Sequence, residues 1–171
     1  MIEWYKKVVF QNYANFNGRA RRSEYWYFTL ANIIVSIILT LLDNALGTKF
    51  GNSGILNTIY SLGIFIPSLA VSVRRLHDIG KSGKLLLLTY GIMIVLVIVM
   101  VVSGLSLFMS GSAPSMSSLG VAFFGPLLAL LAISIWMLVL FCTEGEKGSN
   151  KYGPDPKNDI SEINEIGTSE L

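Results

Sequence analysis

Four long runs without a charged residue constrain what this chain can fold into more than any other feature. They cover residues 25–42, 53–73, 85–120 and 121–143, and the last two follow each other without a charged residue between them. A bilayer core is about 30 Å thick, and about 20 residues of α-helix cross it. Charged residues make up only 14% of the chain and lie between the runs, whereas a soluble protein would expose charged faces at regular periodicity. The runs therefore predict membrane-spanning helices.

A cluster of turn-forming residues divides the longest run. Residues 110–115 read Ser-Gly-Ser-Ala-Pro-Ser, a composition that does not favour a continuous helix, so we expect a hairpin tip there. The sequence thus predicts an all-α integral membrane protein with four transmembrane helices in an antiparallel bundle. The expected spans are about 25–43, 54–73, 85–109 and 119–142.

The two ends of the chain differ from the spans. Near the N-terminus, apolar residues recur every three or four positions, which predicts a short amphipathic helix over 2–16 in the membrane interface. We expect one membrane domain over 1–157. The polar, acidic stretch 158–171 is predicted to be a mobile tail.

The lysines and arginines are unevenly distributed among the connections. Twelve of the 13 lie before the first span, between the second and third, or after the fourth, and only Lys49 lies in the first connection. Basic residues stay on the cytoplasmic side because carrying them across the bilayer is costly. We therefore expect a multi-pass protein of the cytoplasmic membrane with both termini in the cytoplasm.

Polar side chains follow one face of each of the first two spans, at spacings of three or four residues. Because lipid offers such groups no partner, we expect the two faces to meet each other or a shared polar cavity. Two interpretations remain open, namely hydrogen bonding that packs the helices and a path for a substrate or ion. The candidate residues, which we call the polar seam, are Asn32, Ser36, Ser61, Ser68 and Ser72.

Arginines and carboxylates gather in the segments that this orientation places in the cytoplasm. We expect arginine–carboxylate pairs to clamp the connections together, and the surplus positive charge to contact anionic lipid headgroups. Asp155, in a Pro-Asp-Pro turn, is a candidate partner for Arg74 or Arg75. The candidate residues, which we call the polar cluster, are Arg19, Arg21, Arg22, Glu24, Arg74, Arg75, His77, Asp78 and Asp155.

The sequence predicts no catalytic, cofactor-binding or metal-binding residues. Gly80-Lys81-Ser82 is similar to part of a phosphate loop, but that motif requires a glycine where Arg75 stands and a preceding strand. His77 and Asp78 are adjacent, so they cannot form a helical i, i+4 metal pair. We expect no cofactor and no nucleic-acid partner.

Three polar blocks in this order resemble a known family. They are residues 17–26 (NGRARRSEYW), 74–83 (RRLHDIGKSG) and 148–156 (GSNKYGPDP). Over about residues 4–156 the chain resembles the bacterial family called domain of unknown function 805. The resemblance implies a small multispan protein of the bacterial inner membrane, with the polar blocks on its cytoplasmic face and no established activity.

Three classes of function remain open. The short connections favour a scaffold or accessory protein that contacts anionic lipids, a second copy of itself or a membrane protein partner. The polar stripes and Pro67 suit a small oligomeric transporter, channel or lipid-handling protein. A membrane-embedded enzyme acting on a phosphate-bearing lipid would use His77 as acid or base beside Asp78. We favour the accessory role over an enzyme.

Overall fold

A computed structural model describes residues 1–50, 53–109 and 115–157. Four helical segments are long and apolar enough to cross a membrane: α2 (Arg22–Leu46), α3 (Ile55–Asp78), α4 (Lys84–Met109) and Ser117–Cys142. Only 6% to 22% of each apolar window is buried within the protein, so most of these apolar side chains face outward. The predicted all-α membrane protein with four spans is confirmed. The predicted tail, 158–171, and most of the predicted hairpin tip lie outside the described residues.

The chain divides into two compact units. The first unit is formed by Met1–Gly83 together with the described residues from Glu144 onward, and the second by Lys84–Thr143. In chain order, the second unit is therefore an insertion into the first.

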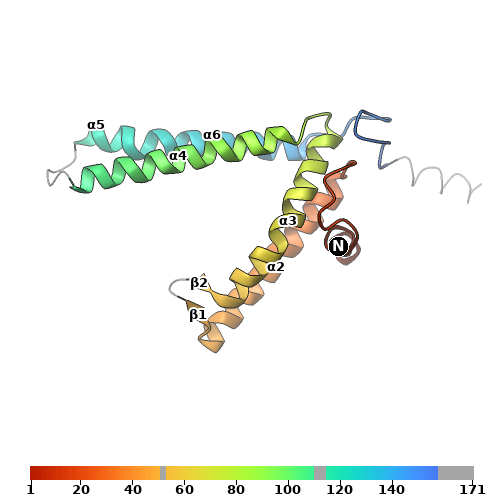
Figure 1. The fold of residues 1–171 in the computed structure, drawn as a ribbon, viewed down its shortest axis with the longest axis horizontal. Coiled ribbons are helices and arrows are strands. Elements are labelled where there is room, and N and C mark those ends of the chain that lie inside the picture. The colour runs from red at the N-terminus through yellow and green to blue at the C-terminus, as the bar shows by residue number, and fades with distance from the viewer. Residues whose placement is uncertain (51–52, 110–114, 158–171) are drawn as a thin grey trace, which may run out of the picture. The chain divides into compact units, whose positions relative to one another are not determined.

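The first unit is built on α2 and α3, which lie side by side and run in opposite directions (Figure 1). Gly47 ends α2 in the left-handed region, with φ +66°, where glycine is the favoured residue. The connection forms a two-residue antiparallel ladder of β1 (Lys49–Phe50) and β2 (Ser53–Gly54), which is the one departure from helix among the described elements. Residue 55 then begins α3 directly.

The N-terminal helix is shorter than predicted. It comprises α1 (Ile2–Lys6) and the π-helical segment η1 (Lys7–Gln11), whereas the sequence pattern predicted helix as far as residue 16. Asparagine side chains form local hydrogen bonds just beyond this end, from Asn12 to the Lys7 carbonyl and from Asn15 to Asn12. Such bonds compete with the helical backbone pattern and explain the early end.

A small apolar core joins this N-terminal segment to the helix pair. Val8 is fully buried together with Ala20, Phe28 and Val71, and Tyr5 stacks on Phe28 with ring centroids 5.9 Å apart. The N-terminal segment is therefore a packed part of the first unit.

The second unit pairs α4 with the last span (Figure 1). That span comprises α5 (Met116–Leu119), the π-helical segment η2 (Gly120–Phe124) and α6 (Gly125–Cys142). Pro126 lies in the first turn of α6, where its missing N–H leaves no gap in the helical pattern.

Candidate functional site

The polar cluster is organised around Asp78, at the C-terminal end of α3. The backbone N–H of Ala20 donates to the carbonyl of Arg74 at 3.0 Å, which holds the segment before α2 against this end of α3. Arg19 Nε then donates to Asp78 Oδ1 at 3.0 Å, with the two side chains only 1% and 6% exposed. Arg75 Nη1 donates to the other carboxylate oxygen, Oδ2. Both oxygens of one buried carboxylate are thus paired with arginines.

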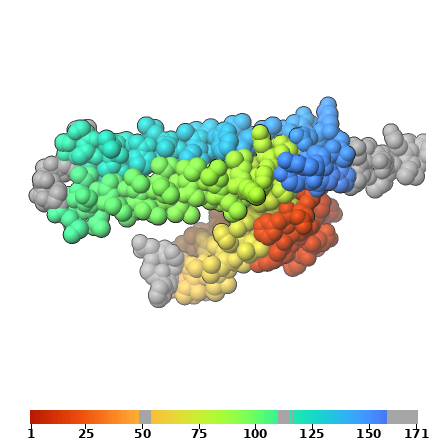
Figure 2. Space-filling view, turned by 45° about the horizontal axis from the view of Figure 1, so that its top comes forward, coloured from red at the N-terminus to blue at the C-terminus, as the bar shows by residue number. Residues whose placement is uncertain are grey.

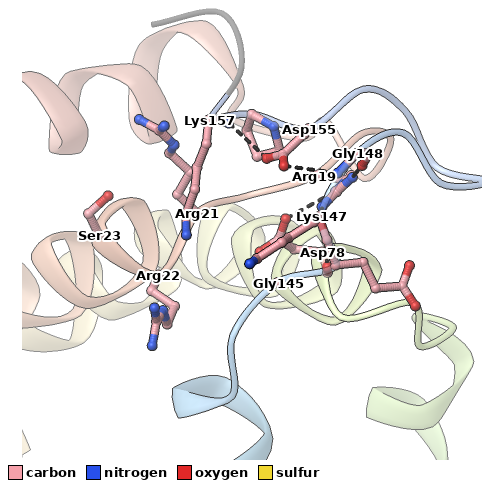
Figure 3. A pocket seen from close by; sticks show the side chains of 12 residues that line it. Arg19, Arg21, Arg22, Ser23, Asp78, Gly145, Lys147, Gly148, Asp155 and Lys157 are labelled. Carbon is pink, nitrogen blue, oxygen red and sulfur yellow. Dashed lines mark hydrogen bonds and ion pairs between the residues drawn. The ribbon is translucent and has the colours of Figure 1, made fainter. Parts of the chain in front are cut away.

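Arg19 also fixes the segment that follows the last span. Its Nη1 donates to the carbonyl of Gly148 at 2.6 Å, and its Nη2 donates to the carbonyl of Glu146 (Figure 3). In return, the Glu146 N–H donates to the Asp78 carbonyl at 2.8 Å. A Cβ at Gly145 would collide with the Asp78 carboxylate, so this close approach requires glycine. Figure 2 shows the segment, in blue, against the N-terminal residues, in red.

A second buried ion pair lies beside the first. Arg74 Nη1 and Glu24 Oε1 are 2.6 Å apart, and both side chains are almost fully buried. The other carboxylate oxygen, Oε2, lies 3.2 Å from Lys7 Nζ. Arg74 Nε and Nη2 are buried without a hydrogen-bond partner among the described residues. Because a buried charge is costly without its partner, this pair fixes α2 against α3.

His77 is enclosed by its neighbours. Its Nδ1 lies 3.2 Å from the carbonyl of Gly18, and its ring stacks on Tyr152 with centroids 3.8 Å apart. Asn150 Nδ2 donates to the His77 carbonyl at 3.0 Å. These contacts give His77 a role in holding the segment after the last span. Within the described ranges, no three His, Cys, Asp or Glu side chains gather in an arrangement that could hold a metal.

Asp155 organises the turn in which it lies. The expected partner was Arg74 or Arg75, but the carboxylate instead accepts hydrogen bonds from the N–H groups of Gly148 at 3.1 Å and Lys157 at 2.9 Å. The reason is local, because an Asp side chain readily reaches the amide two residues further on. The Lys157 N–H lowers the pKa of Asp155 below its ordinary value; burial opposes this, and the Gly148 N–H adds to the lowering.

Arg21 and Arg22 border a cavity of about 540 Å³ between the start of α2 and the segment after the last span (Figure 3). Lys147 and Lys157 also line it. Glu144 Oε1 lies 3.6 Å from Arg22 Nη2 and 3.1 Å from Lys157 Nζ, and all three side chains are about half exposed. The hydrogen bond and charge of Lys157, with the charge of Arg22, lower the pKa of Glu144.

Among the described residues of the polar seam, Asn32 is the one with a hydrogen bond across the α2–α3 pair. Tyr60 donates to Asn32 Oδ1 at 2.5 Å, and its hydroxyl lies 3.2 Å from that of Tyr5. Ser68 and Ser72 instead donate to carbonyls four residues earlier in their own helix.

The other two seam residues lie further along the helix pair. The Ser36 carbonyl accepts a hydrogen bond from Thr40 at 2.7 Å. Ser61 lines a pocket near the β1–β2 connection, where Asn57 Nδ2 donates to Thr40 Oγ1 at 3.0 Å.

Asp43 is an important residue that was not among the predicted site residues. Its carboxylate is 1% exposed and accepts hydrogen bonds from the N–H groups of Leu56 at 3.1 Å and Asn57 at 3.0 Å, and from Thr48 Oγ1 at 2.6 Å. It therefore caps the first turn of α3 from the end of α2. A Cβ at Gly54 would collide with this carboxylate. The one indication of this role in the sequence is that Asp43 continues the row of polar residues on one face of the first span.

The family model described as "Protein of unknown function (DUF805)" matches residues 13–154. The chain belongs to this family. It is 37% identical over 156 residues to inner membrane protein YhaI of Escherichia coli strain K12, covering 91% of this chain and 97% of that protein. It is 38% identical over 159 residues to inner membrane protein YhaH of the same strain, covering 91% and 98%. No solved structure matches.

The family match extends over the whole polar cluster except Asp155, one residue beyond its end. The four apolar helices and the inner-membrane relatives together make this DUF805 chain a multi-pass protein of the inner membrane.

Proposed function

We propose that this protein is an accessory protein of the inner membrane whose polar cluster faces the cytoplasm and gathers anionic lipid headgroups. The observation that carries this proposal is that three arginines are buried in ion pairs, whereas two others border a cavity. Arg19, Arg74 and Arg75 are buried in ion pairs that hold the first unit together. Arg21 and Arg22 instead border the cavity together with Lys147 and Lys157, so positive charge gathers where an anionic headgroup would bind at the membrane surface.

The proposed sidedness rests on charge. Twelve of 13 basic residues fall in segments on one side of the four spans, as expected for a cytoplasmic face. In a Cys142→Ser background, Ser149→Cys should be protected from an impermeant thiol reagent in intact cells, and Ser115→Cys should react. The reverse pattern would contradict the orientation.

The hydrogen bonds of the polar seam support an accessory role over transport. Ser68 and Ser72 satisfy their hydroxyls within α3, and Asn32 is engaged by Tyr60. Groups already paired in this way stabilise a helix pair, whereas a transport path needs polar groups that exchange partners with a substrate.

Lipid enrichment tests the proposed function. The full-length protein, reconstituted in mixed phosphatidylglycerol and phosphatidylcholine, should enrich phosphatidylglycerol around itself, and salt should weaken the enrichment. Removing both charges with Arg21→Gln and Arg22→Gln should reduce it, whereas Lys49→Gln, in the first connection, should leave it unchanged. Equal amounts of the two lipids around the wild-type protein would refute the proposal.

A further inference from the structure

We infer that the cavity beside the start of α2 is a binding site for a phosphate group, with Arg21 as its principal ligand. This inference deepens the proposed function and depends on it only where the phosphate is carried by a lipid. A phosphomonoester on a headgroup and inorganic phosphate in solution present the same chemistry to the cavity, and the experiment below separates these two sources.

The cavity has the size and boundaries of a built site. Its volume of about 540 Å³ lies within the usual range for ligand pockets, roughly 300 to 1,000 Å³. Its walls are fixed, because Arg19 and Asp78 join the segment before α2 to α3 and to the carbonyls of Glu146 and Gly148. A ligand therefore enters a preformed space.

Arg21 is the strongest indication of an anionic ligand. Its Nε is buried without a hydrogen-bond partner, and no ion pair or hydrogen bond engages its guanidinium among the described residues. A buried N–H without an acceptor is unfavourable, and a guanidinium offers its donors in a geometry that matches phosphate oxygens. Nε itself is enclosed by protein, so a phosphate in the cavity would accept hydrogen bonds from the other N–H groups of the Arg21 guanidinium.

The start of α2 adds further donors on the same wall. Arg21 stands at the N-cap position with extended backbone, and no side chain caps the first turn. Ser23, in that turn, lines the cavity. The positive end of a 25-residue helix favours a phosphate at this position, in support of the Arg21 contact.

The charge of the lining fits a phosphomonoester. Five basic and three acidic side chains line the cavity, which leaves two positive charges in excess. Each acid already has partners: Asp78 pairs with Arg19 and Arg75, Asp155 accepts from backbone N–H groups, and Glu146 accepts from Asn150. A phosphomonoester carries about −1.5 to −2 near neutral pH, so it would balance the surplus.

Glu144 is the competitor that the structure identifies. Its exposed carboxylate contacts Arg22 and Lys157, two cations of the lining. An incoming phosphate must share these cations with Glu144. Removing the Glu144 charge should therefore tighten phosphate binding, a result that a purely structural role of the cavity would not give.

The test uses the full-length protein in phosphatidylcholine nanodiscs, titrated by calorimetry with inorganic phosphate at constant ionic strength. Arg21→Gln should weaken binding by about tenfold, the loss expected for one charge-assisted contact. Lys81→Gln removes an exposed cation outside the cavity and should have little effect. Glu144→Gln should strengthen binding, which keeps the test decisive even if Arg21→Gln fails to fold.

A parallel set of nanodiscs distinguishes the two sources of phosphate. If the ligand is a headgroup, phosphatidic acid, which exposes a phosphomonoester, should be retained in preference to phosphatidylglycerol, and Arg21→Gln should abolish the preference. Binding of inorganic phosphate in neutral nanodiscs would instead support a free ligand. The site is refuted if Arg21→Gln and Lys81→Gln behave alike in both arms. The proposed function survives that result if phosphatidylglycerol is still enriched over phosphatidylcholine.

Discussion

Tyr13 donates a 2.6 Å hydrogen bond to the carbonyl of Gly63, the acceptor that an α-helix would pair with the N–H of residue 67. Residue 67 is proline and has no N–H. The N-terminal segment therefore supplies, through one phenol group, the donor that α3 lacks.

We expect Tyr13→Phe to lower the free energy of unfolding by about 1 kcal/mol, the usual value of one hydrogen bond. In a Pro67→Ala background the same change should cost less, because alanine restores an N–H for the Gly63 carbonyl. A double-mutant cycle of unfolding in detergent measures the coupling between the two positions. Equal costs in both backgrounds would show that the Tyr13 hydroxyl does not compensate for the proline.

Gly54→Ala should lower the melting temperature, because the new Cβ collides with the Asp43 carboxylate that caps α3. The matched control is Gly91→Ala in α4, where a Cβ meets no atom within 4 Å and the melting temperature should not fall. Adding Asp43→Ala removes the collision, so Gly54→Ala should then cost less. An unchanged cost would place the strain elsewhere.

Asp78→Asn should destabilise the protein by about 3–5 kcal/mol, since it leaves buried Arg19 and Arg75 without the charge of their shared partner. Glu144→Gln breaks exposed pairs and should change stability little. Unfolding in detergent measures both effects. In Asp78→Asn, trypsin should also cleave faster after Lys147; cleavage at the wild-type rate would show that Asp78 does not hold this segment.

Acid should release the turn around Asp155. The pKa of Asp155 is lower in the folded protein than its ordinary carboxyl value of about 3.9. The ionised carboxylate therefore contributes its full stabilisation at pH values above about 3.9, and this stabilisation is lost as the pH falls through the folded pKa. The NMR shift of the Gly148 N–H, whose acceptor is Asp155, should report this transition. Asp155→Asn should remove it, whereas a transition midpoint above 3.9 would contradict the lowered pKa.

The spans could be predicted from the sequence because each one is recognised by its own residues. A segment long enough to cross a membrane and without charge can be identified without knowing its tertiary contacts. The end of the first helix was less predictable: its apolar periodicity continues to Phe16, but asparagine side chains beyond Gln11 compete for the backbone. Local side-chain chemistry decided the boundary there.

Pairings within the polar cluster were harder to predict than its membership. Five arginines were available to a few acids, and the contacts of Arg19 reach residues 59 and 129 positions away in the chain. Composition alone does not select among such partners. Tyr60 was missed because a tyrosine within an apolar span resembles packing, although its hydroxyl connects Tyr5 to Asn32.

The hydrogen bonds of Arg19 to Glu146 and Gly148 also set an order for assembly during synthesis. Arg19 and Asp78 both precede the last helical hairpin in the chain, so their pair can form before that hairpin is complete. The carbonyls that complete the guanidinium's contacts arrive only after that hairpin. Until residues 146 and 148 are synthesised, the Arg19 guanidinium therefore lacks two of its acceptors. A chain stalled before residue 146 would have the pair of Arg19 and Asp78 without these two contacts.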